Sequence, residues 1–200
     1  MSNTHREFES RIMLTDEEYL SIVSYYLKIY PNHKFLQISN VYFDSEDLFL
    51  RNSHITLRVR TTNDVKSELT VKIKGSNGDQ EINDDINPKE KDLLLNKGIF
   101  PNGAVKNYLL TLPYHLSSYK QISSLHNRRL EIQFDDHLLV IDKNNYNDIT
   151  DYNLEIETKN SIELANIVLQ EYIKKFHLSL HSQKYHGKAH RAIDSALKKD

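Results

Sequence analysis

The stretch that decides the fold reads Leu69-Thr70-Val71-Lys72-Ile73-Lys74. Apolar and polar residues alternate in it at every second position, which is the period of a β-strand. One face of this strand is therefore expected to be apolar, and the other to carry two lysines. Such a strand needs a packed layer against its apolar face and surroundings that tolerate like charges on the other.

The same period recurs along most of the chain. Eight stretches are expected to form strands, at approximately 5–14, 34–43, 54–62, 66–75, 79–86, 123–135, 137–144 and 150–158. Helical spacing and capping signals predict helices over about 15–31, 87–98, 103–112, 161–176 and 183–197. Because strands and helices do not alternate regularly, we predict a mainly β (α+β) fold with an antiparallel sheet.

The charged faces of the expected strands carry doublets of a single sign. The doublets are Glu7 and Glu9, Arg58 and Arg60, Lys72 and Lys74, and Glu155 and Glu157. Like charges two residues apart on a strand lie only about 7 Å from each other. One interpretation is a sheet with one face under helices and the other in water.

The alternative is a barrel, which eight strands can close, with the apolar faces outside under the helices and the charges around an interior tunnel. Buried like charges need partners, so such a tunnel would have to hold metal ions and a polyanion.

Composition excludes several classes of protein. The chain has 200 residues and is expected to form one domain over 1–200. It contains no cysteine, which excludes a disulfide scaffold and a cysteine nucleophile. The net charge of −2 argues against a nucleic-acid partner. Its apolar runs are too short to span a membrane and its start is polar, so we expect a cytoplasmic protein.

The first of these strands, Glu7-Phe8-Glu9-Ser10-Arg11, resembles the ExExK signature of the CYTH superfamily, the triphosphate tunnel metalloenzymes. Further stretches match in the order of the family. They are Tyr42-Phe43-Asp44, Leu57-Arg58-Val59-Arg60, Leu69-Thr70-Val71-Lys72-Ile73-Lys74, Arg129-Leu130-Glu131-Ile132, Leu139-Val140-Ile141-Asp142 and Asp151-Tyr152-Asn153-Leu154-Glu155-Ile156-Glu157. The resemblance spans about residues 5–195 and points to the small bacterial CYTH proteins of the Firmicutes type.

This resemblance implies an eight-stranded antiparallel tunnel with a charged interior and helices packed outside. It implies a metal-dependent enzyme whose substrate is a triphosphate, namely tripolyphosphate, ATP or thiamine triphosphate. The metal, Mg²⁺ or Mn²⁺, prefers carboxylate oxygens. The implied metal ligands are Glu7, Glu9, Asp142, Glu155 and Glu157. Without metal, the paired glutamates are expected to repel one another, which raises some of their pKa values.

The implied phosphate-binding residues are Arg58, Arg60, Lys72, Lys74, Arg129, Lys188 and Arg191, with Lys184 as a competing candidate in the last helix. Neither a Walker A nor a G-x-G-x-x-G loop is present, so side chains would have to bind the phosphates. The expected catalytic residues are Glu7, Glu9 and Arg11.

Two positions depart from the family pattern. Arg11 stands where the family usually has lysine; arginine binds phosphate but does not lose a proton at working pH, so it is a poor candidate for a base. Gln80-Glu81 replaces a basic residue near a glutamate, and Glu81 keeps the acidic role.

Three functions are compatible with these residues. The first is hydrolysis of the terminal phosphate of a triphosphate, preferably tripolyphosphate. The second is the class IV adenylate cyclase reaction, in which the ATP 3′-hydroxyl replaces water. The third is a non-catalytic module that binds polyphosphate or nucleotide. The protein is expected to be a monomer or a homodimer.

Overall fold

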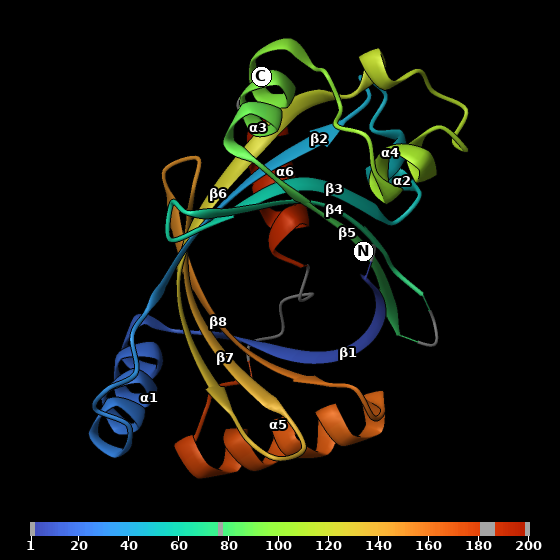
Figure 1. Cartoon of the computed structure of the whole chain (residues 1–200). Helices are drawn as coiled ribbons and strands as arrows, with labels where there is room; N and C mark the ends of the chain where they lie inside the picture. Colours follow the sequence, from blue (N-terminus) through green and yellow to red (C-terminus); the bar gives the residue numbers. More distant parts are fainter. Residues whose placement is uncertain (1–2, 76–77, 181–186, 199–200) are drawn as a thin grey trace.

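Eight antiparallel strands close into a barrel in the order β1-β5-β4-β3-β2-β6-β7-β8 (Figure 1). The computed structural model describes residues 3–75, 78–180 and 187–198, with side chains from residue 8 onward. The strands are β1 (Asn3–Leu14), β2 (Leu36–Asp44), β3 (Ile55–Thr62), β4 (Lys66–Ile73), β5 (Asp79–Ile86), β6 (Lys120–Gln133), β7 (Leu138–Tyr146) and β8 (Ile149–Thr158). The prediction of a mainly β, eight-stranded antiparallel barrel is confirmed.

Six helices lie within the described part of the chain. They are α1 (Asp16–Ile29), α2 (Phe49–Asn52), α3 (Pro88–Lys97), α4 (Ala104–Leu109), α5 (Ile162–Phe176) and α6 (Lys188–Leu197). Thr15 and Glu18 form the capping box that starts α1, and Asn87 and Glu90 form the one that starts α3. Gly98 ends α3 in the left-handed conformation, with φ of 66°.

Some boundaries differ from the expected ones. Strand β6 begins at Lys120, three residues before the expected start, because its first residues pair with the end of β2. The short helix α2 was not predicted, since four residues are too few to show a helical period. The Asp44 carboxylate orders it by accepting the backbone N–H groups of Leu50 and Arg51 at 2.8 and 2.9 Å. The last expected helix, 183–197, includes residues 183–186, which lie outside the described residues.

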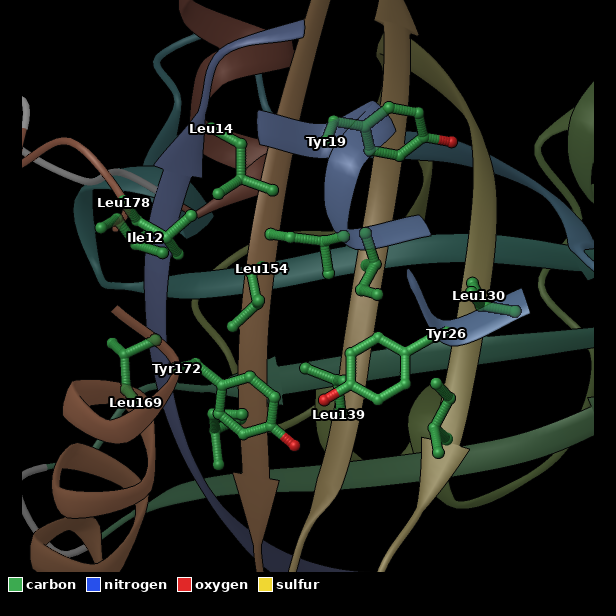
Figure 2. Close-up of a cluster of buried hydrophobic side chains, with 14 of the residues drawn as sticks. Ile12, Leu14, Tyr19, Tyr26, Leu130, Leu139, Leu154, Leu169, Tyr172 and Leu178 are labelled. Carbon is green, nitrogen blue, oxygen red and sulfur yellow. The ribbon is translucent and has the colours of Figure 1, made fainter. Parts of the chain in front are cut away.

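The apolar faces of the strands point outward, under the helices. One cluster joins β1, β6, β7 and β8 to α1 and α5, and Figure 2 shows Tyr26 of α1 and Tyr172 of α5 over Leu139 and Leu154 of the sheet. A second cluster joins β3, β4 and β5 to α3 and α4. Strand alternation then directs the other side chains to the interior, so the barrel has the inverted arrangement, with charge inside. No helix within the described ranges combines the length and the apolar run needed to cross a membrane.

We expect the outward-facing residues of β3 to stabilise the fold and to take no part in ligand binding. Leu57 is 1% exposed in the second cluster. Leu57→Ala should lower the free energy of unfolding by about 2–5 kcal/mol, because the shortened side chain leaves a cavity. Urea unfolding measures this loss. The control Leu20→Ala removes a side chain that is 55% exposed, and its effect should stay within about 0.5 kcal/mol. Equal losses in both variants would contradict the assignment of the two faces.

Candidate active site in the barrel interior

The barrel encloses a cavity of about 300 Å³, here called the tunnel cavity. Its lining is almost entirely charged or polar and comes from β1, β2, β3, β4, β5, β6, β8 and the start of α6. The lining residues are Glu9, Arg11, Tyr42, Thr56, Arg58, Arg60, Glu68, Lys72, Lys74, Glu81, Asn83, Arg129, Glu131, Glu155, Glu157, Gly187, Lys188, Ala189 and His190. Most of the expected site residues therefore meet in one space.

Three carboxylates gather on neighbouring strands. The antiparallel register of β1 and β8 places Glu9 opposite Glu157 and Arg11 opposite Glu155. One carboxylate oxygen from each of Glu9, Glu155 and Glu157 lies within 4.8 Å of the others, and these three residues are here called the acidic cluster. The Oε1 atom of Glu155 is buried without a hydrogen-bond partner in the described structure. Several hard oxygen donors, one of them unsatisfied, fit a divalent cation such as Mg²⁺ or Mn²⁺.

Cations balance the acidic cluster in the metal-free protein. Lys188 Nζ lies 2.5 Å from Glu155 Oε2, and Arg11 contacts Glu9 and lies 3.6 Å from Glu155 Oε1. Burial raises the pKa of Glu155, but Lys188, Arg11 and Arg129 outweigh it and hold this pKa below its usual value. The expectation of raised pKa values is therefore wrong for Glu155, because strand pairing and α6 bring cations that neutralise it.

The wall formed by β3, β4 and β5 is mainly cationic. Lys72 Nζ lies 3.7 Å from Glu9, 3.3 Å from Asp79 and 3.4 Å from Glu81. Arg58 lies 3.6 Å from Glu81. Burial raises the pKa of Glu81, but Arg58, Lys72 and Arg60 outweigh it and lower this pKa to about 2. Glu81 is thus an anion that orients Arg58 and Lys72.

Two further cations of this wall lie close to other positive charges. Burial, together with Arg58 and Arg129, lowers the pKa of Arg60 to about 10, so Arg60 stays charged near pH 7. Burial and the neighbouring Arg11 lower the pKa of Lys74. Cations crowded in this way are expected to bind an anion that relieves their repulsion.

Asp142 lies behind the cavity lining and holds cations. Its two oxygens accept from Arg129, each at 2.9 Å, from Asn127 at 2.8 Å and from Lys188 at 2.6 Å. Its side chain is fully buried, it is not one of the three carboxylates of the acidic cluster, and Lys188 links it to Glu155 of that cluster. Its role as a metal ligand stays a prediction, whereas its contacts orient Arg129 and Lys188.

The remaining expected residues are placed differently. The Arg191 side chain binds Asp151 at 2.7 and 2.9 Å and does not line the described cavity. The side chain of Glu7 and the whole of Lys184 lie outside what the structure describes. The predicted roles of these three residues stay predictions.

Sequence reasoning missed some lining residues. Tyr42 was quoted only as part of a matching stretch, and Glu68 and Asn83 were not singled out. Strand β2 carries no doublet of like charges, so its pattern does not indicate an interior charged face. The interior position of Tyr42 follows from register, which pairs it with Arg58 of β3.

An acidic cluster that faces a cationic wall inside an inverted barrel fits a divalent cation and an anion side by side. Residues 5–185 match the CYTH domain family, and the chain belongs to this family. It is 30% identical over 151 residues, 76% of each chain, to YjbK of Bacillus subtilis, which is named provisionally as a triphosphatase.

Two solved structures share the fold. The first is a Bacillus halodurans protein described provisionally as an adenylate cyclase, with a TM-score of 0.84 and 28% identity over 94% of this chain and 97% of that one. The second is HpAC1 of Hippeastrum, described as having a dominant triphosphatase activity, with a TM-score of 0.67 and 20% identity over 90% and 92% of the two chains.

Glu155→Gln tests the acidic cluster. Removing this buried charge takes one of two anionic partners from each of Lys188 and Arg11, so the metal-free protein should melt at a lower temperature than wild type. Excess Mg²⁺ or Mn²⁺ should raise the melting temperature of wild type by mass action, and of the variant much less. The control Glu171→Gln changes an exposed glutamate of α5 and should behave as wild type. If the metal raises the melting temperature of Glu155→Gln as much as that of wild type, Glu155 does not bind the metal.

Proposed function

We propose that this chain is a divalent-metal-dependent triphosphatase that removes the terminal phosphate of tripolyphosphate inside the tunnel cavity. The observation that carries the proposal is the meeting of three carboxylates and at least five cationic side chains around one cavity of about 300 Å³. Membership of the CYTH family and similarity to YjbK support it.

Glu9, Glu155 and Glu157 hold Mg²⁺ or Mn²⁺, and when bound the metal supplies charge neutralisation for the phosphate oxygens. Glu7 stays a predicted ligand and catalytic residue. Asp142 also stays a predicted ligand, and its present contacts keep Arg129 and Lys188 directed toward the cavity.

The cationic wall binds and orients the phosphate chain. Arg58, Arg60 and Lys72 donate to its oxygens, with Lys74, Arg129 and Lys188 completing the positive surroundings. The Nε atom of Arg58 is buried and has no hydrogen-bond partner in the described structure, so this donor is available to a phosphate oxygen. Arg191 remains a predicted contact of the chain.

The reaction adds water to the terminal phosphorus. A bond forms between the water oxygen and phosphorus, the bond to the bridging oxygen breaks, and orthophosphate and pyrophosphate leave. Glu9 orients the water and accepts its hydrogen bond. Arg11 acts through its charge, because it contacts Glu9 and lies 3.6 Å from Glu155.

The cavity lining favours inorganic tripolyphosphate over a nucleotide. Proteins commonly bind exposed bases by stacking them on aromatic rings. Among the described lining residues, the aromatic rings are those of Tyr42, which is 2% exposed, and His190. We infer that the lining suits phosphate groups and gives a base little surface.

The adenylate cyclase reaction is the second candidate, because the Bacillus halodurans relative carries that provisional description. The same charged cavity would bind the triphosphate of ATP, with the 3′-hydroxyl in place of water. The two candidates differ in products.

One panel of assays separates these functions. Tripolyphosphate, ATP and thiamine triphosphate are each incubated with Mg²⁺ or Mn²⁺ and assayed for phosphate, pyrophosphate and cyclic AMP. We expect the highest turnover with tripolyphosphate, equal amounts of orthophosphate and pyrophosphate, and no turnover in EDTA. Cyclic AMP with stoichiometric pyrophosphate would establish the cyclase instead. Tight binding without turnover of any triphosphate would establish a binding module.

Arg58→Ala tests the cationic wall. Loss of a charge-assisted hydrogen bond should weaken tripolyphosphate binding by about 1.5–3 kcal/mol, roughly tenfold to hundredfold, in calorimetry. Arg128→Ala is the matched control, because Arg128 lies over the Phe35 ring on the outside of the barrel. Its affinity should equal that of wild type. Equal losses of affinity in both variants would mean that Arg58 acts only through the net charge of the protein.

A further inference from the structure

The first turn of α6 opens into the tunnel cavity. Gly187, Lys188, Ala189 and His190 all line this cavity, and the helix that follows has 10 residues. No side chain of the described residues caps this end of the helix. The first N–H groups of a helix have no partner within it, and they carry a partial positive charge that favours an anion.

Two cations lie against this positive helix end. A Cβ atom built on Gly187 would come 2.9 Å from Arg11 Nη1 and 4.0 Å from Lys74 Nζ, so both side chains reach the N-cap position. Cations beside a helix N-terminus are electrostatically unfavourable. An anion between them would convert this repulsion into attraction.

An independent observation points to the same anion. Tyr42 lines the tunnel cavity, and only 2% of the residue is exposed to solvent. Its hydroxyl makes no hydrogen bond to any residue within 8–75, 78–180 or 187–198. The hydroxyl is not among the fully enclosed atoms that lack a partner, so it reaches the cavity and can donate a hydrogen bond to an anion there.

The position of Tyr42 connects it to both the helix and the cationic wall. Tyr42 belongs to a cluster that includes Ala192 and Ile193 of α6, with Ala189 packed against it. Strand register pairs Tyr42 directly with Arg58. Tyr42, the first turn of α6 and Arg58 therefore line the same cavity.

We propose that the backbone N–H groups of Lys188 and Ala189 and the Tyr42 hydroxyl form a subsite for one phosphate group of the polyphosphate chain. This inference rests on the proposed function and adds neutral, directional donors to the cationic wall. Such donors bind phosphate oxygens at fixed angles, whereas lysine charges attract an anion with little directional preference. The subsite therefore sets the register of the phosphate chain relative to the acidic cluster.

The test measures tripolyphosphate binding by calorimetry in EDTA, so that neither metal binding nor turnover contributes. Tyr42→Phe removes only the hydroxyl and should weaken binding about tenfold or more, as expected for a hydrogen bond to a charged group. Tyr119→Phe is the matched control. Tyr119 is also 2% exposed and its hydroxyl also lacks a partner in the described structure, but it lies in the outer cluster of β3, β4 and β5. Its affinity should be unchanged.

Ala189→Asp and Ala189→Asn test the helix end. Both substitutions disturb the packing of residue 189 against the Tyr42 cluster to a similar extent, but only aspartate adds a negative charge that repels a phosphate, so its affinity should fall. Asparagine of the same shape should lose much less affinity. If wild type binds tripolyphosphate while Tyr42→Phe and Ala189→Asp bind it equally well, the subsite is wrong and the proposed function stands. If wild type neither binds nor hydrolyses tripolyphosphate, the proposed function itself fails.

Discussion

A connected series of alternating charges runs through the barrel interior, and the candidate site depends on it. The series is Arg129, Asp142, Lys188, Glu155, Arg11 and Glu9. Each inner member contacts charges of the opposite sign, so buried groups that would be costly alone remain ionised. Four strands, β1, β6, β7 and β8, meet α6 in this series, so the fold and the site depend on each other.

The outward position of the apolar faces follows from the charged interior of the barrel. Because the interior is charged, the apolar faces of the strands need cover from outside, and the helices supply it. A packed apolar interior would leave no space for a ligand. Here the two large hydrophobic clusters lie outside the barrel wall, and the wall surrounds a cavity of about 300 Å³. Along each strand, the outward-facing residues therefore stabilise the fold, and the alternating inward-facing residues line the cavity.

The ion pairs around Glu155 also affect how the proposed enzyme would bind a metal ion and a polyphosphate. Glu155 has Lys188 and Arg11 as partners, while its Oε1 atom has no hydrogen bond in the described structure. A metal ion and a polyphosphate carry opposite charges, so binding both together changes the balance of the cavity less than binding either one. This pairing explains why an acidic cluster and a cationic wall are found a few ångströms apart, as Lys72 and Glu9 are at 3.7 Å.

The sequence by itself determined the strands, their antiparallel arrangement and the separation of apolar from charged faces, because residue alternation is a local property of each strand. The capping boxes of α1 and α3 were predictable for the same reason. Only the tertiary structure decided which charges meet. Strand register places Glu9 beside Glu157, and α6 brings Lys188 to Glu155 from a distant part of the chain. Asp142 stays a predicted metal ligand, and only the structure shows that its oxygens accept from Arg129 and Lys188. Such partners depend on contacts between strands and helices that no local pattern records.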